Sequence, residues 1–216
     1  MTGLPGPASG PGSGDCEIDV MTLDHLVYAT PDVEESVRHI AGLTGVWPAE
    51  GGRHIGGGTR NFLLGLGGLR YLEIVGPDRE QPEPARPLFL GIGDLTAPRL
   101  VTWAARADDI DAQVARARRR GYDPGPVEPM SRKTPTGETV SWRLTRWYDT
   151  VVPFLIDWGT TPHPARNLPV ATLTSFTGSH PDPAKARAAL AALGVELPVS
   201  QGEPGLVAVI GDAILK

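Results

Sequence analysis

The sequence has a single cysteine, no long apolar run and no excess of basic residues. Cys16 has no partner for an internal disulfide and cannot build a cysteine-based metal site, which is typical of a reducing compartment and leads us to expect a cytoplasmic protein. No stretch approaches the roughly 20 apolar residues that span a membrane, and the N-terminus lacks the basic and apolar regions of a secretory signal. We therefore expect neither membrane insertion nor export.

Charge argues against a nucleic-acid partner. The 20 Lys and Arg residues are outnumbered by 25 Asp and Glu residues, which gives a formal charge of -5, and the basic residues do not gather on one face. Gly and Pro are abundant instead, with 27 and 22 residues, so many tight turns are expected. Residues 1–14 consist almost entirely of Gly, Pro, Ser and Ala, and we expect a disordered tail that reaches residue 19.

A degenerate repeat organises the rest of the chain. Three strand-like runs each lead into an acidic residue that starts a helical pattern, and each pattern ends at a glycine suited to a left-handed C-terminal cap. The runs are residues 23–29, 100–105 and 170–176, the acids are Asp32, Asp108 and Asp182, and the glycines are Gly45, Gly121 and Gly194. The acids follow one another by 76 and 74 residues, which predicts repeated structural units.

Further strand-like runs complete these units. They lie at residues 59–66, 70–76, 139–146, 152–158, 206–211 and 213–215. The expected order is βαβββ in the first two units and a shortened βαββ in the third. The predicted division is a tail at 1–19, a first module at 20–78, a linker with a short helix near 88–95 at 79–98, a second module at 99–160 and the third unit at 161–216.

Four segments carry a resemblance to a known family. They are LDHLVYATPD (23–32), GGRHIGGGTRNFLLGLG (51–67), YLEIVGPD (71–78) and FLIDWGTTPHPA (154–165). Together they resemble the glyoxalase-like domain family of the vicinal oxygen chelate superfamily. The resemblance implies an α+β fold of the glyoxalase, bleomycin-resistance and dioxygenase type, in which paired βαβββ modules curve into a cup. It implies no single reaction, because the superfamily includes isomerases, lyases, epimerases, dioxygenases and non-catalytic antibiotic-binding proteins.

The resemblance also implies metal ligands on the first and last strand of each module. His25 and Glu73 hold these positions in the first module, and imidazole and carboxylate suit one divalent ion such as Zn²⁺, Fe²⁺, Mn²⁺ or Ni²⁺. Without a metal, His25 is a histidine with ordinary partners in a strand and Glu73 a solubilising charge at a strand edge. Both interpretations stay open at this point.

The second module departs from this ligand pattern. Val101 stands where a second histidine is expected, and the counterpart of Glu73 is either Ile156 or, after a slip of one residue, Asp157. Because neighbouring residues of a strand face opposite sides, that slip decides whether a carboxylate enters the cup. A complete site would need a third ligand from His54, Asp157 or His163.

The glycine-rich segment and the tryptophans offer groups for a substrate. Arg60 and Asn61 follow three glycines, and Arg60 could hold a carboxylate through two hydrogen bonds. The alternative is a flexible hairpin whose arginines face water. Trp103 and Trp158, like most of the tryptophans, suit the core, although an apolar ligand pocket is a second interpretation.

Two functions follow from these residues. The first is a metal-assisted lyase or isomerase acting on a small carbonyl or oxyanionic substrate. The metal on His25 and Glu73 would act as a Lewis acid, Glu73 or His54 would move a proton, and Arg60 would hold the anionic end. The second is a metal-free protein that sequesters an antibiotic or aromatic metabolite. In both cases the partner is a small molecule, and a homodimer is a compatible assembly.

Overall fold

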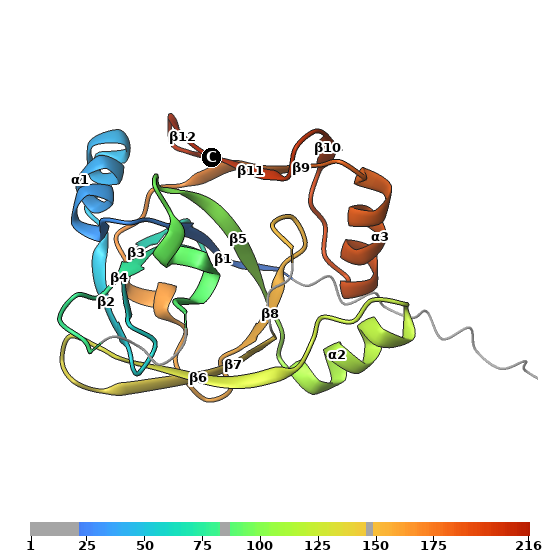
Figure 1. The fold of residues 1–216 in the computed structure, drawn as a ribbon, viewed down its shortest axis with the longest axis horizontal. Helices are drawn as coiled ribbons and strands as arrows, with labels where there is room; N and C mark the ends of the chain where they lie inside the picture. The colour runs from blue at the N-terminus through green and yellow to red at the C-terminus, as the bar shows by residue number, and fades with distance from the viewer. Residues whose placement is uncertain (1–21, 83–86, 146–148) are drawn as a thin grey trace, which may run out of the picture.

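The computed structural model describes residues 22–82, 87–145 and 149–216 (Figure 1). The predicted tail and Trp147 lie outside these ranges. The first module consists of β1 (Leu23–Ala29), α1 (Val33–Thr44), β2 (Ala49–His54), β3 (Thr59–Gly65) and β4 (Tyr71–Pro77). The second consists of β5 (Arg99–Arg106), α2 (Ile110–Arg119), β6 (Val127–Lys133), β7 (Thr139–Thr145) and β8 (Phe154–Asp157). The expected βαβββ order is confirmed in both modules.

The two modules form one closed barrel rather than an open cup. Its strand order is β1-β4-β3-β2-β6-β7-β8-β5, so each module contributes four consecutive strands. Within each module the first and last strands pair in parallel, as at Val27 and Glu73. Antiparallel pairs between the modules close the barrel, one between β1 and β5 and a short one that pairs His54 with Arg132. The predicted α+β class with curved sheets is therefore confirmed.

The helix boundaries follow the predicted caps at α1, whereas both ends of α2 differ by one residue, and its C-cap is Arg120 rather than Gly121. Asp32 accepts a hydrogen bond of 2.9 Å from the Glu35 amide at the start of α1, and Gly45 ends that helix with a φ of 72°. The expected start of α2 at Asp108 is wrong by one residue. Asp109 caps this helix by accepting a hydrogen bond of 3.0 Å from the Ala112 amide.

The C-terminal unit differs from the two modules in topology. It contains β9 (Leu173–His180), α3 (Pro183–Leu193), β10 (Val199–Gln201), β11 (Gly205–Ile210) and β12 (Ala213–Leu215). Its sheet order is β10-β9-β11-β12, so the strands joined by the helix are neighbours, whereas β1 and β2 are separated by two strands. The strand expected at 170–176 begins later, because Ala171 donates its amide hydrogen to the Gly65 carbonyl at the end of β3. The similar spacing of helix-start acids and helix-end glycines therefore does not produce a third module of the same fold.

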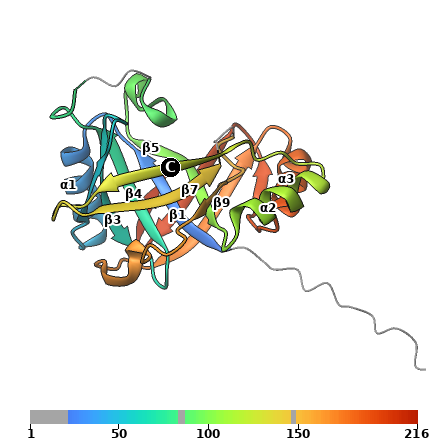
Figure 2. The same cartoon turned by 90° about the horizontal axis from the view of Figure 1, so that it is seen from below.

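Strand alternation divides the apolar residues into two cores. Leu26 of β1 and Ile74 of β4 face outward, into a core that the three helices and the C-terminal sheet cover. Val27 and Val75 face inward and join a second core inside the barrel. Figure 1 and Figure 2 show α1 on one side of the barrel and α2 with α3 on the other. Among the described residues, none of the helices combines the length and apolar character that crossing a membrane requires.

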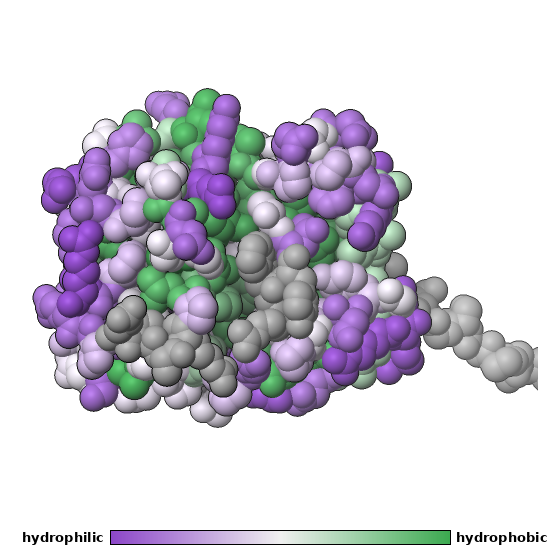
Figure 3. All heavy atoms as spheres, viewed as in Figure 1, coloured by the Kyte–Doolittle hydropathy of each residue, from purple (hydrophilic) through white to green (hydrophobic). Residues whose placement is uncertain are grey.

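The described C-terminal part of the connector between the modules borders the barrel interior. Where a short helix was expected, the structure has the 3-10 segment η1 (Phe89–Asp94), which left-handed backbone at Leu90 and Gly91 interrupts. A second 3-10 segment, η2 (Pro164–Asn167), follows β8. In the space-filling view, apolar side chains gather in the middle of the face that η1 occupies, and hydrophilic side chains dominate its margins (Figure 3). Phe89, Leu90 and Ile92 of η1 contribute to the wall of the pocket described next.

Candidate functional site

The barrel encloses a small pocket with an apolar wall and a few polar groups. Its cavity volume of about 60 Å³ exceeds the roughly 10–15 Å³ that one water needs, so it has room for a few waters or a small molecule. Apolar side chains such as Val27, Leu63 and Phe154 make up most of the wall. The polar groups are His25, His54, Thr59, Asn61, Tyr71, Glu73 and Arg132.

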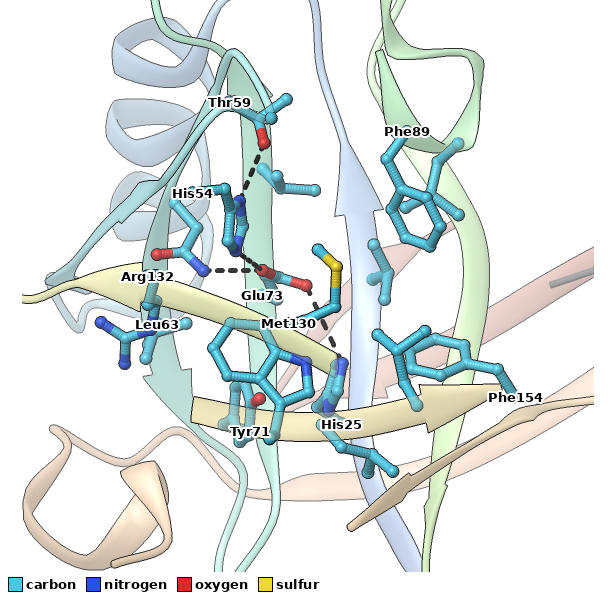
Figure 4. A pocket seen from close by; sticks show the side chains of 18 of the residues that line it. His25, His54, Thr59, Leu63, Tyr71, Glu73, Phe89, Met130, Arg132 and Phe154 are labelled. Atoms are coloured by element: carbon cyan, nitrogen blue, oxygen red, sulfur yellow. Dashed lines mark hydrogen bonds and ion pairs between the residues drawn. The ribbon is translucent and has the colours of Figure 1, made fainter. Parts of the chain in front are cut away.

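Glu73 lies at the centre of these polar groups (Figure 4). It enters the barrel because it alternates on β4 with the outward Leu72 and Ile74. One carboxylate oxygen, Oε2, is 3.8 Å from His25 Nε2, and the other, Oε1, is 3.7 Å from His54 Nε2. The Asn61 amide nitrogen donates a hydrogen bond of 2.6 Å to Oε1. Three candidate residues, His25, His54 and Glu73, are thus brought together.

The orientation of His25 is fixed by the residue before it. Its Nδ1 is 2.8 Å from the Asp24 carboxylate, and its ring stacks on Tyr71 with centroids 4.6 Å apart. An ionised carboxylate only accepts hydrogen bonds, so the proton lies on Nδ1 and Nε2 faces Glu73. The family resemblance indicated His25 as a candidate metal ligand but did not indicate Asp24 as its hydrogen-bond partner.

Asp24 is a fully buried charge with four hydrogen-bonding partners. Besides His25 it accepts hydrogen bonds from Arg106 Nε at 2.9 Å, His163 Nε2 at 3.0 Å and Trp158 Nε1 at 3.2 Å. Burial acts to raise the pKa of Asp24, but the hydrogen bonds from His163 and His25 outweigh it, and the pKa lies below its ordinary value. His163, a candidate third metal ligand, is therefore part of this cluster.

His54 occupies the other side of Glu73 as a neutral base. Its Nδ1 is 2.8 Å from the Thr59 hydroxyl across the turn that joins β2 to β3. Burial lowers the pKa of His54 from its ordinary value of 6.5, so the imidazole is uncharged near pH 7. The turn contains the three glycines at residues 56–58, and Gly56 and Gly58 have positive φ angles. The segment is therefore a hairpin that joins β2 to β3, and it also contributes His54 and Asn61 to the pocket.

Three polar residues of the pocket, Thr59, Tyr71 and Arg132, were not predicted as site residues. Tyr71 is buried beside His25, and burial raises its pKa well above 10, so its phenol stays protonated. Arg132 is only 6% exposed, and burial lowers the pKa of its guanidinium. No sequence pattern indicated Arg132, because its strand reads VEPMSRK, which lacks apolar alternation and contains Pro129.

Three candidate residues lie away from the pocket. Arg60 faces outward and forms an ion pair with Glu34 of α1. Trp103 packs in the outer core, where its Nε1 donates a hydrogen bond of 2.8 Å to the Val151 carbonyl. Asp157 also faces outward and accepts a hydrogen bond of 3.3 Å from the Ile110 amide. Strand alternation explains all three positions, and it places Ile156 rather than Asp157 in the barrel.

The donor atoms do not match the metal site that the sequence suggested. His25 and His54 face different oxygens of Glu73, so the carboxylate lies between the two imidazoles. The second module contributes Val101 and Ile156 to the inner core, and neither can bind a metal. In the described parts of the chain, no group of three or more His, Cys, Asp and Glu side chains could hold a metal ion.

Removal of divalent metal is expected to leave the stability of the protein unchanged. A metal present at a hundred times its Kd would add about 2.7 kcal/mol, which would raise the Tm by several degrees. Dialysis against EDTA, followed by a thermal melt, should show no such loss. A Tm that falls with EDTA and recovers with Zn²⁺, Fe²⁺, Mn²⁺ or Ni²⁺ in the parent, but not in His25→Ala, would contradict this expectation.

Comparisons with solved structures found similarity to three proteins of interest. A crystal structure of a hypothetical protein from Staphylococcus aureus aligns with a TM-score of 0.65 and 13% identity over 90% of this chain and 93% of that one. Methylmalonyl-CoA epimerase from Mycobacterium tuberculosis aligns with a TM-score of 0.43 and 19% identity over 65% and 88% of the two chains. A Streptomyces coelicolor methylmalonyl-CoA epimerase variant, in complex with 2-nitronate-propionyl-CoA, aligns with a TM-score of 0.45 and 19% identity over 67% and 99%.

Family membership follows from the sequence itself. Among curated proteins, none matches the chain. The model of the glyoxalase-like domain family matches residues 23–194, which include both modules of the barrel and α3. The chain therefore belongs to the glyoxalase-like domain family.

Proposed function

We propose that the protein is an enzyme of the isomerase or lyase type that moves a proton at a carbon atom beside a carbonyl group of a small substrate. The observation that supports this proposal is the carboxylate of Glu73, which lies between two imidazoles in an apolar pocket. A carboxylate is a suitable base for such a carbon acid, and an apolar pocket limits competition from water.

Each polar group has a part in this reaction. Glu73 takes the proton from carbon, and the electron pair of the broken C–H bond moves to the carbonyl oxygen to give an enolate. Tyr71, a protonated phenol in the same pocket, is available as a neutral donor. His54, uncharged near pH 7, is available to exchange a proton with Glu73. Return of the proton to carbon completes an isomerisation, and loss of a leaving group from the enolate completes an elimination.

A sequestering protein is the second candidate function. The rings of Trp142 and Trp158 have centroids 5.3 Å apart and line the same pocket, where they offer an apolar surface to an aromatic ligand. This function needs no base, so Glu73 would contribute little beyond a hydrogen bond. Proton exchange and ligand binding therefore distinguish the two candidates.

The test is proton exchange in deuterated water. A panel of small 2-hydroxy and 2-oxo carbonyl compounds is incubated with the protein, and loss of the C–H signal is followed by NMR. We expect exchange with the parent and a rate about 10²–10⁴ times lower with Glu73→Gln, the usual range for loss of a general base. Glu34→Gln is the matched control, because Glu34 lies on the outside of α1. Equal exchange by the parent and Glu73→Gln would overturn the proposal.

A further inference from the structure

The pocket contains a buried cation, Arg132, with one nitrogen atom that has no hydrogen-bond partner among the described residues. Arg132 pairs with His54 across the β2 and β6 strands, so the two side chains share the inner face of the barrel. Its Nη1 atom is shielded from solvent and, among the described residues, has no hydrogen-bond partner, although the charge of Glu73 attracts the guanidinium. A buried charged group costs free energy unless its hydrogen-bonding atoms are paired. An anionic ligand that accepts a hydrogen bond from Nη1 would remove this cost.

A second unpartnered atom lies in the same part of the pocket. Asn61 donates its amide nitrogen to Glu73, and because a carboxylate only accepts, the amide oxygen must face the other way. That oxygen, Oδ1, is buried and has no partner in the described part of the chain. It can accept a hydrogen bond but cannot donate one, so a ligand would need an O–H or N–H group to pair with it.

The two unpartnered atoms, Arg132 Nη1 and Asn61 Oδ1, lie next to the backbone of Gly51 and Gly52. A Cβ atom on Gly51 would lie 2.2 Å from Asn61 Oδ1, and a Cβ atom on Gly52 would lie 3.1 Å from Arg132 Nη1. Both groups therefore border these neighbouring glycines of β2. The protein thus places an unpaired donor with positive charge and an unpaired acceptor next to the same stretch of backbone, beside the proposed catalytic carboxylate.

We propose that Arg132 and Asn61 form a subsite for the carboxylate and the neighbouring hydroxyl group of a small hydroxy acid. This inference rests on the proposed function, since it names the substrate class of the same pocket. The carboxylate accepts hydrogen bonds from the Arg132 guanidinium, and the hydroxyl donates to Asn61 Oδ1. The cavity of about 60 Å³ restricts the ligand to a few heavy atoms. Arg132 thereby takes the anion-binding part that the sequence assigned to Arg60, which instead pairs with Glu34.

Binding of matched probes tests the subsite without any need for turnover. Lactate carries both groups, propanoate lacks the hydroxyl, and lactamide lacks the charge. Titration calorimetry of the parent should show lactate binding at least tenfold more tightly than either control, since a hydrogen bond to a charged group is worth about that much. Binding of all three with equal affinity, or no binding of lactate at millimolar concentration because waters satisfy both atoms, would overturn the inference.

Substitutions of Arg132 and Asn61 test whether lactate binds at these two residues. Arg132→Met should weaken lactate at least tenfold, Arg132→Lys should recover part of the loss, and Asn61→Leu should remove the preference for lactate over propanoate. Arg60→Met is the matched control and should bind as the parent does, because Arg60 lies outside the barrel. If Arg132→Met fails to fold, the comparison of probes on the parent and Arg132→Lys still decides. Lactate binding that Arg132→Met leaves unchanged would overturn the inference.

The inference and the proposed function can fail separately. Selective lactate binding that depends on Arg132, in a protein that exchanges no proton, would support the subsite and contradict the enzyme. Exchange that depends on Glu73, with compounds that carry no carboxylate and with full activity in Arg132→Met, would support the enzyme and contradict the subsite.

Discussion

Replacement of Asp24 by alanine is expected to lower the free energy of unfolding by about 3–5 kcal/mol, the usual cost of removing one partner of a buried ionic network. The Asp24 carboxylate is fully buried and accepts hydrogen bonds from Arg106, His25, His163 and Trp158. Its loss would leave these donors without their acceptor inside the protein. Urea unfolding at pH 7 measures the difference.

The same carboxylate makes the stability depend on pH in a defined direction. The pKa of Asp24 is lower in the folded protein than in the unfolded chain, where it is about 3.9, so folding is favoured whenever the carboxylate is ionised. This contribution is complete above about pH 5 and is lost as the pH falls below about 4. Asp24→Asn should therefore flatten the acid side of the stability profile.

An exposed aspartate supplies the control for both measurements. Asp123 forms a surface ion pair with Arg118, and its side chain is 65% exposed. Pairs of this kind contribute about 0–1 kcal/mol, so Asp123→Ala should have a small effect. An Asp24→Ala variant no less stable than Asp123→Ala would show that the cluster around Asp24 does not stabilise the fold.

The sequence predicted those elements whose signals are local. The N-caps Asp32 and Asp182 and the C-caps Gly45 and Gly194 lie where the pattern placed them, because a cap depends on residues within one turn. The βαβββ order requires a strand at β2, but no strand-like run was recognised there because AEGGRH has two glycines and no apolar alternation. Its place in the barrel depends on β3 and β6, which no local pattern reveals.

The sequence indicated the candidate site residues that belong to the first module, but not those that the second module contributes. His25 and Glu73 were found from the resemblance, and the parallel pairing of β1 with β4 brings their strands together. Arg132 enters the pocket only because β6 pairs with β2 of the other module. Whether Ile156 or Asp157 faces inward depends on register, which sequence alone left open. Residues that act across the closure of the barrel were therefore beyond sequence reasoning.

The closure of the barrel between β2 and β6 can be tested by substitution of one glycine, Gly52. Gly52 has a φ of 136°, a conformation that other residues rarely adopt, and a Cβ atom there would lie 1.9 Å from the Lys133 carbonyl oxygen of β6. The strain in φ alone costs about 1–3 kcal/mol, and relief of the clash requires β2 and β6 to separate where Arg53 pairs with Lys133.

We therefore expect Gly52→Ala to destabilise the protein by more than about 3 kcal/mol, because both the backbone strain and the broken strand pair add to the cost. Gly42→Ala is the control of opposite sign. Gly42 lies within α1 with nothing near its Cβ position, and alanine is favoured over glycine in a helix by about 0.5–1 kcal/mol. Thermal and urea unfolding should move the two variants in opposite directions. Gly52→Ala at parental stability would mean that the β2 and β6 pair does not hold the barrel closed, and Arg132 would then lack the support that keeps it beside the pocket.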